Sequence, residues 1–214
     1  MKNIFSIIFT FFYFFSYAQY VEPEKSVKEE IKRKQNEIVH YPKIKFDSIE
    51  AKNMLALGKG QIKGVAFTRA RDSKNFGLKT GDKIKANKIK ITLFPVTSYF
   101  REYYALWSDK SKNNPKKNTF VYLDPEAYRY RLEAITNSDG EFTFPDMKPG
   151  KYYLFGSLAY TTTYTKQQYT GSGYDGYGRI DYYTPYQTSK DTSEFLETFV
   201  EIKADGEVVN IKLK

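Results

Sequence analysis

The stretch TNSDGEFTFPDMKPGKYYL, from Thr136 to Leu154, contains three carboxylates, Asp139, Glu141 and Asp146, within eight residues. Its first residues are Asn, Ser and Asp, which favour turns through hydrogen bonds from the side chain to the nearby backbone, and Gly140 tolerates a positive φ. The acidic side chains therefore stand where a chain reversal is expected. We interpret them as turn formers rather than as an acidic reaction centre.

The residues after this turn predict a short strand and a second turn. Phe142 and Phe144 share one face of the strand because side chains alternate along a strand. Met147 can enter the core while Pro149-Gly150 reverses the chain into KYYLF. A calcium loop needs an acidic first ligand and a closing glutamate, but Ile135 stands at the first position and no glutamate closes the loop. The stretch therefore predicts no metal site.

From Gly60 onward the sequence alternates apolar and polar residues, with turn residues between the runs. No strand-like run alternates with a long helix, so we do not expect a parallel α/β sheet. Asp205-Gly206 is a strong hairpin signal. We predict an all-β fold, an antiparallel sandwich of about seven or eight strands. The expected strands lie within residues 60–68, 88–96, 118–123, 128–136, 140–144, 151–165 and 195–214.

These residues resemble the carboxypeptidase regulatory-like domain, a transthyretin-like (prealbumin-like) sandwich of bacterial secreted proteins. The resemblance covers residues 60–214, and it implies the fold but no activity. Residues 69–87 depart from the family as a long loop or an extra hairpin. In zinc carboxypeptidases such a domain accompanies a catalytic domain, and this sequence shows none. The family pattern is carried by Ile62, Gly64, Thr136, Gly140, Phe142, Phe144, Met147, Pro149, Gly150 and Tyr152.

The first residues predict export. Lys2 precedes the uncharged apolar run 4–15, and Ser16-Tyr17-Ala18 forms a small-x-small cleavage site, as in a secretory signal peptide at residues 1–18. The alternative is a retained membrane anchor, although a spanning helix needs about 20 apolar residues. With the signal removed, we expect a periplasmic, extracellular or surface-associated protein without a transmembrane segment.

Residues 19–58 predict a helical lead before the sandwich domain at residues 59–214. Ser26 and Glu29 form a capping box, and Glu30 with Lys34 adds an ion pair one helical turn apart. A second helix is expected between a cap at Asp47 or Ser48 and a stop at Gly58.

Composition excludes several classes of protein. The chain has no cysteine, which rules out disulfides, thiolate metal sites and cysteine nucleophiles. The single histidine, His40, stands between a charged helix and a proline, and we interpret it as a surface or linker residue. The net charge of +9 becomes +8 without Lys2, and it is dispersed along the chain. We expect no nucleic acid partner, no cofactor and no metal, and the sequence leaves the oligomeric state open.

Residues 160–186 contain eight tyrosines among twenty-seven residues, interleaved with Gly, Ser, Thr and Gln. Tyrosine offers rigid amphipathic area, and this composition is typical of binding loops. The alternative is an elongated hairpin whose alternate tyrosines pack on the sandwich, with a flexible tip. The candidate binding residues are Tyr160, Tyr164, Tyr169, Tyr174, Tyr177, Tyr182, Tyr183 and Tyr186.

A second candidate site lies in TSYFREYYALW, residues 97–107, which follows the strand that ends at Pro95. Tyr99, Arg101 and Glu102 could line a groove at the end of the sandwich. Alternatively, the aromatic residues of this loop cover the core, because aromatic burial contributes most to core stability.

Three functions follow from these observations. The first is a non-catalytic accessory or protein-interaction module of the cell envelope. The second is a carbohydrate or peptidoglycan binder that uses the tyrosines of residues 160–186. The third is a hydrolase that uses a pair of carboxylates. No spacing among the available carboxylates selects such a pair, so we expect no catalytic residues; those carboxylates are Asp124, Glu126, Glu133 and Glu141.

Overall fold

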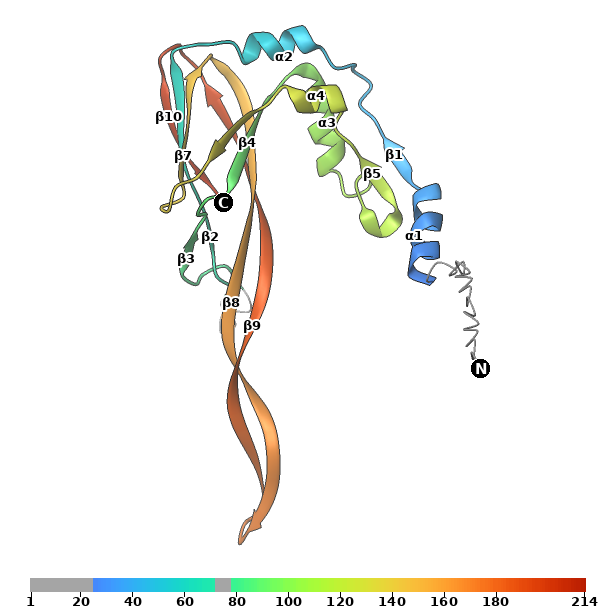
Figure 1. Cartoon of the computed structure of the whole chain (residues 1–214), viewed down its shortest axis with the longest axis vertical. Coiled ribbons are helices and arrows are strands. Elements are labelled where there is room, and N and C mark those ends of the chain that lie inside the picture. The colour runs from blue at the N-terminus through green and yellow to red at the C-terminus, as the bar shows by residue number, and fades with distance from the viewer. Residues whose placement is uncertain (1–24, 72–77) are drawn as a thin grey trace, which may run out of the picture.

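The computed structural model describes residues 25–71 and 78–214 (Figure 1). Its helices are α1 (Lys25–Gln35), α2 (Ser48–Met54), α3 (Ser98–Ser108), the 3-10 helix η2 (Pro115–Lys117) and α4 (Pro125–Arg129). Its strands are β1 (Ile38–His40), β2 (Gly60–Arg69), β3 (Lys83–Lys85), β4 (Lys90–Pro95), β5 (Thr119–Val121), β6 (Leu132–Ile135), β7 (Glu141–Met147), β8 (Gly150–Asp175), β9 (Gly178–Ile202) and β10 (Val208–Leu213).

The predicted signal peptide, residues 1–18, lies outside the described residues, as do the side chains of the predicted capping box at Ser26 and Glu29. The predicted ion pair of α1 is present, with Lys34 Nζ 3.5 Å from Glu30 Oε1. Within residues 25–71 and 78–214, no helix is both long and apolar enough to cross a membrane.

Eight strands of the described chain form two sheets. In the first sheet, β2 pairs with β10 along one edge and with β7 along the other, and β3 pairs with β2 beyond the end of β7. The second sheet has the order β6-β4-β8-β9, and all its pairs are antiparallel. The predicted antiparallel sandwich is confirmed in its coarser part, because the described chain is mainly β with antiparallel sheets and a few short helices. The transthyretin-like topology stays a prediction.

The main hydrophobic core lies between the two sheets. The first sheet contributes Ile62, Phe144 and Leu213, and the second contributes Leu93 and Leu154, each of them buried. Burial of this apolar surface supplies most of the driving force for folding, at about 25 cal/mol for each Å². The alternation seen in the sequence thus places one face of each sheet in the core.

The second sheet is buried on its other face as well. Phe94 of β4 stacks on Phe100 of α3 with ring centroids 5.5 Å apart, and Tyr153 of β8 lies 5.4 Å from the same ring. Tyr128 of α4 lies 6.1 Å from Phe94. The helices α3 and α4 therefore form a third layer over this sheet, as Figure 1 shows beside β4.

Two predictions about strand pairing were wrong. Strand β10 runs parallel to β2, with Val209 opposite Ile62, and β1 runs parallel to β5. The predicted hairpin at Asp205-Gly206 is instead a crossing from the second sheet to the first. Asp205 Oδ1 accepts a hydrogen bond of 2.9 Å from the Lys59 N–H at the start of the first sheet, so this side chain ties the turn to a different strand.

Three segments that the sequence left open or misassigned are now defined. Of the two alternatives for residues 69–87, the described residues agree with the extra hairpin, because β3 pairs antiparallel with the end of β2. Residues 98–108 form the helix α3, not a loop, and the Thr97 hydroxyl caps it by accepting a 3.1 Å bond from the Phe100 N–H. Helix α2 has the predicted cap at Asp47, but it ends at Met54. Gly58 lies beyond that end, close to β7.

The stretch from Thr136 to Leu154 forms the predicted turns. Asn137 Oδ1 accepts from the N–H groups of Asp139 and Glu141, each at 2.9 Å. Gly140 has φ +78°, and a Cβ there would lie 2.4 Å from the Ala66 carbonyl oxygen of β2. Only glycine fits at this position, for reasons of both backbone conformation and space.

We expect the Gly140→Ala variant to lose more stability than the Gly206→Ala variant. Both glycines are left-handed, with φ +78° and +85°, so each change strains the backbone by about 1–2 kcal/mol. A Cβ on Gly206 meets nothing within 4 Å, whereas one on Gly140 collides with backbone, which adds about 1–3 kcal/mol. Urea unfolding of both variants measures the difference, and equal losses would show that the contact with β2 is not tight.

Candidate functional site

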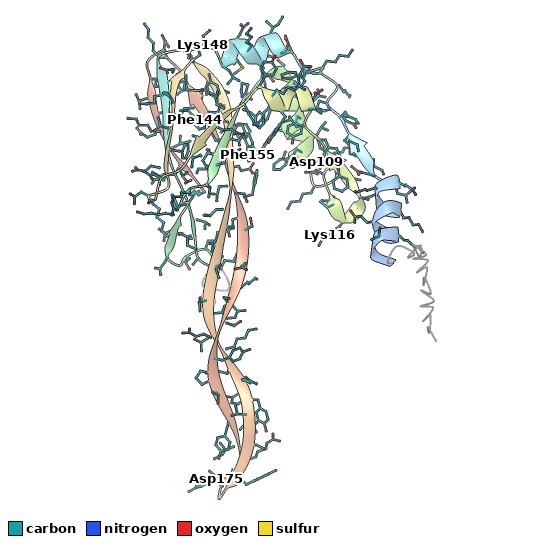
Figure 2. All side chains as sticks on the ribbon, in the orientation of Figure 1. Asp109, Lys116, Phe144, Lys148, Phe155 and Asp175 are labelled. Atoms are coloured by element: carbon teal, nitrogen blue, oxygen red, sulfur yellow. The ribbon has the colours of Figure 1, made fainter. Side chains whose placement is uncertain are left out.

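The tyrosine-rich segment forms an arm that projects from the sandwich. We define the arm as residues 160–192, the part of the β8–β9 hairpin from the Tyr160–Thr192 pair to its tip. Strand β4 pairs with β8 only from Tyr152 to Gly156, so in the described chain β9 is the sole partner of β8 along the arm. Figure 1 shows the arm extending well beyond the two sheets, and Figure 2 shows side chains projecting from both of its faces.

One face of the arm carries Tyr164, Tyr182 and Tyr186. Lys166 is paired directly with Tyr186, and its Nζ lies 5.5 Å from the centre of the Tyr164 ring. The Tyr182 ring covers Gly173, where a Cβ would lie 2.8 Å from the tyrosine hydroxyl. Directly paired residues share a face in an antiparallel ladder, so these rings form one row.

The opposite face carries Tyr169, Tyr174 and Tyr183. Tyr169 and Tyr183 are paired directly, with ring centroids 5.8 Å apart in an edge-to-face arrangement. Tyr174 is paired with Arg179, and its side chain is 83% exposed. Tyr177 lies fully exposed at the tip.

The tip of the arm is an ordered turn. Asp175 Oδ1 accepts hydrogen bonds from the N–H groups of Tyr177 and Gly178, at 2.8 and 3.0 Å. This Asx-type arrangement is the local signature of a turn. The turn therefore presents Tyr177 in a defined place at the end of the arm.

The interpretation that alternate tyrosines pack on the sandwich applies to only one of them. Tyr160 packs against the main core, while the other seven tyrosines of the segment are exposed. The arm also carries no net charge, because three basic residues balance three acidic residues between Tyr160 and Thr192. It is therefore a neutral surface of aromatic rings, hydroxyls and amides on a basic protein.

A buried carboxylate fixes the base of the arm to the first sheet. Glu194 of β9 is 8% exposed, accepts a short hydrogen bond from the Thr68 hydroxyl of β2, and pairs with Lys79 Nζ at 2.8 Å. The Tyr160 hydroxyl donates to the same carboxylate at 3.3 Å. Burial alone would raise the pKa of Glu194, but the bonds from Lys79 and Thr68 outweigh it and hold the pKa below its usual value.

The three candidates in α3 do not form one site. Tyr99 is buried, and its hydroxyl accepts a 2.8 Å bond from the Asp124 N–H. Glu102 accepts a 2.8 Å bond from the Ile44 N–H, and this bond lowers the pKa of Glu102. Arg101 is exposed. Tyr99 thus holds the segment at Asp124 against α3, and Glu102 holds the segment at Ile44.

The sequence did not reveal a small aromatic cavity between α3 and the second sheet. Its volume is about 230 Å³, and its walls are aromatic rings except for Leu123. Burial raises the pKa of Tyr103 to about 12, and burial with the bond to Glu197 raises the pKa of Tyr153, so both hydroxyls stay protonated near neutral pH. The rings come from Phe94, Phe100, Tyr103, Tyr104, Trp107, Tyr128, Tyr153, Phe155 and Phe195.

Three of the carboxylates considered for hydrolysis take part in a helix cap, ion pairs and a turn. Asp124 caps α4 by accepting from the Glu126 N–H at 2.7 Å. Glu133 is bound by Arg131 and Lys90, at 2.8 and 3.0 Å. Glu141 accepts from the Asn137 amide in the turn before β7. His40 lies in β1 opposite Val121.

The chain matches no protein-family model, and no curated protein matches it. The similarity to the carboxypeptidase regulatory-like domain therefore stays a prediction. Among solved structures, the chain is similar to the crystal structure of a candidate carbohydrate-binding protein from Pseudomonas aeruginosa. The two are 22% identical, with a TM-score of 0.47, over 79% of this chain and 98% of the other.

We expect the stabilising effect of Glu194 to depend on pH. A folded-state pKa below the unfolded value of 4.5 stabilises the fold above that pH, and the effect is lost as the pH falls through the folded-state pKa. The Glu194→Gln variant should be about 1–3 kcal/mol less stable than the parent protein at pH 7. Melting temperatures of both proteins from pH 7 to pH 3 test this, because the gap should shrink below pH 4.5. A constant gap would contradict it.

Proposed function

We propose that the protein is an exported, non-catalytic binding protein that holds carbohydrate chains against the tyrosines of the arm. One observation carries the proposal: seven exposed tyrosines line a projecting hairpin that has no net charge. The apolar run at residues 4–15, with the cleavage site after it, supports a place outside the cytoplasm, where such chains occur.

Exposed tyrosines in this setting suit a sugar ligand. A tyrosine ring offers a flat apolar face for the C–H groups of a sugar ring, and its hydroxyl offers a hydrogen bond. The residues between the tyrosines are mainly Thr, Ser, Gln and Gly, which add donors and acceptors at low steric cost. Tyrosine loses little conformational entropy on binding because it has only two side-chain torsions.

The arm also gives the rings a regular spacing. Its ladder is continuous from the Tyr160–Thr192 pair to the Asp175–Gly178 pair, with one irregularity between Tyr169 and Gly171. The bonds to Glu194 fix the start of this ladder to the first sheet. A carbohydrate chain would therefore meet rings that are already in place.

We expect the double variant Tyr174→Ala, Tyr177→Ala to bind glycans about fivefold or more weakly than the parent protein, because each lost ring removes about 0.5–1.5 kcal/mol of stacking. A glycan array identifies the ligand, and calorimetry on that ligand measures the loss. The matched control, Tyr41→Ala with Tyr122→Ala, removes two exposed rings away from the arm and should bind as the parent does. Binding that survives in the arm variant would remove the arm from the site.

A second candidate function is protein interaction by strand addition. In the described chain, neither β8 nor β9 has a further partner along the arm, so both outer edges present unpaired backbone N–H and C=O groups. Unpaired edges are templates for an added strand. The same arm would then bind an envelope protein through its backbone rather than through its rings.

A variant without the arm separates the two candidates. Thr162 and Lys190 are directly paired, so joining them through Asn-Gly in place of residues 163–189 closes a tight hairpin and keeps the core. We expect this variant to keep the melting temperature of the parent within a few degrees and to lose every ligand of the arm. Crosslinking in intact cell envelopes then distinguishes the two functions. Strand addition is supported if a protein partner is lost in the variant without the arm but is still crosslinked by the Tyr174→Ala, Tyr177→Ala variant. If this variant does not fold, the two sheets depend on the arm for their stability, which would contradict this expectation.

A further inference from the structure

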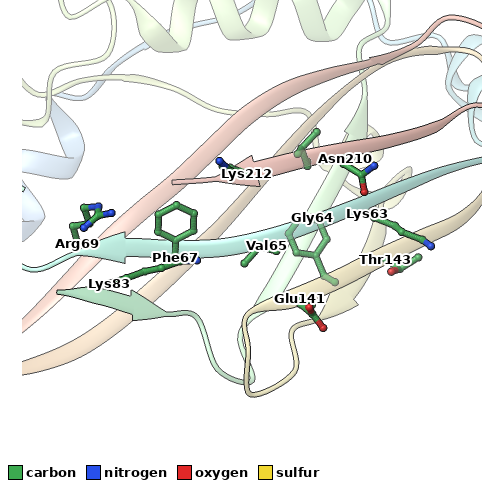
Figure 3. Close-up of a pocket in the computed structure, with 12 residues that line it drawn as sticks. Lys63, Gly64, Val65, Phe67, Arg69, Lys83, Glu141, Thr143, Asn210 and Lys212 are labelled. Atoms are coloured by element: carbon green, nitrogen blue, oxygen red, sulfur yellow. The ribbon is translucent and has the colours of Figure 1, made fainter.

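The outer face of the first sheet forms a shallow groove of about 690 Å³. Lys63, Phe67 and Arg69 project from β2 on this face, since they are separated by even numbers of residues in one strand. Asn210 and Lys212 lie alongside on β10, and Figure 3 shows the labelled residues on β2 and on its neighbours β3, β7 and β10.

Four cations line the groove, and none of them has a carboxylate partner among the described residues. They are Lys63, Arg69, Lys83 and Lys212, each exposed. The groove contains one carboxylate, Glu141, which already accepts a 2.9 Å bond from the Asn137 amide. The groove therefore has a formal charge of +3. A solvent-exposed sheet face needs polar residues but no excess of positive charge.

Two of the cations repel each other across the sheet, although Arg69 Nη1 also donates a 3.2 Å bond to the Gly81 carbonyl. Arg69 and Lys83 are directly paired across β2 and β3, and like charges in such a pair destabilise a sheet. Lys83 Nζ lies 4.1 Å from the centre of the Phe67 ring, which draws the ammonium over the middle of the groove. An anionic group bound between these side chains would relieve the repulsion.

The groove leads toward the arm. A second hollow of about 510 Å³ shares Phe67, Arg69 and Lys212 with it and also contains Thr68 and Lys79. Thr68 and Lys79 are the residues that bind Glu194 at the base of the arm. The cationic surface thus continues from the sheet to the place where the tyrosines begin.

We infer that this groove binds the acidic groups of the same carbohydrate chain that the arm holds, so that the ligand is an acidic polysaccharide. This inference rests on the proposed function. A carboxylated sugar suits the site because the Phe67 ring offers a flat face and the cations surround it. The Phe67 side chain is half-buried and is therefore not free to insert into a lipid layer. We therefore propose a polysaccharide rather than a membrane as the ligand of the groove.

The test uses polygalacturonate as the acidic chain and dextran as the neutral chain, with the full protein at low and physiological salt. The groove variant replaces four cations with glutamine: Lys63→Gln, Arg69→Gln, Lys83→Gln and Lys212→Gln. The control variant makes the same change in charge at exposed lysines away from the groove: Lys110→Gln, Lys112→Gln, Lys116→Gln and Lys117→Gln. Thermal melting verifies that both variants are folded.

We expect the groove variant to bind polygalacturonate at least about tenfold more weakly than the parent protein. The affinity of the control variant should differ from that of the parent by less than about threefold. The affinity of the parent should fall with added salt, and that of the groove variant should depend on salt less. Equal losses in both variants, or no binding of polygalacturonate by the parent, overturn the inference. Binding of phosphatidylglycerol vesicles in place of the polysaccharide, lost in the groove variant, also overturns it in favour of a membrane.

The two variants distinguish a wrong role for the arm from a wrong ligand for the groove. If Tyr174→Ala, Tyr177→Ala has no effect but the groove variant loses polygalacturonate, the role of the arm is wrong and the groove is supported. If the arm variant loses binding and the groove variant does not, the arm is supported and the acidic ligand is wrong.

Discussion

The second sheet is apolar on both faces, and the arrangement of the molecule depends on that constraint. Tyr152 and Leu154 of β8 enter the core against the first sheet, while Tyr153 and Phe155 pack toward α3. A strand with this pattern exposes hydrophobic surface unless a layer covers each side of it. The first sheet covers one side and the helices α3 and α4 cover the other. These helices are therefore part of the fold and not an appendage to a sandwich.

The same strand sets the geometry of the arm. Leu158 of β8 and Leu196 of β9 are buried in the main core, just before the hairpin leaves it. A slip of β9 by one residue against β8 would turn Leu196 to the opposite face while Leu158 stayed in the core. Because core burial fixes the register at the base, it also decides which tyrosines share a face many residues away. Glu194 adds to this by linking the base to Thr68 of the first sheet.

Much of the fold could be predicted from the sequence because a period of two marks half-buried strands, and Gly140 marks a turn that no other residue can make. Helix α3 could not, because aromatic residues favour strands and its cap, Thr97, follows directly after a strand. The sequence allowed the aromatic residues of 97–107 to cover the core, but it did not indicate that they would do so from a helix. The eight tyrosines could be named from composition. The exposure of these tyrosines could not be predicted. Local β propensity is the same for a strand of tyrosines that packs on a sheet and for one that projects from it.

If the arm binds carbohydrate as proposed, its shape favours a flexible chain as the ligand. A two-stranded ribbon twists more strongly than a strand within a larger sheet, and Figure 1 shows β8 and β9 winding around each other along the arm. Each row of tyrosines, such as Tyr164, Tyr182 and Tyr186, therefore turns around the axis of the ribbon. A rigid globular partner with a flat surface would meet only part of such a row. A polysaccharide can follow the twist from ring to ring, and at the base of the arm it would reach the cations around Phe67.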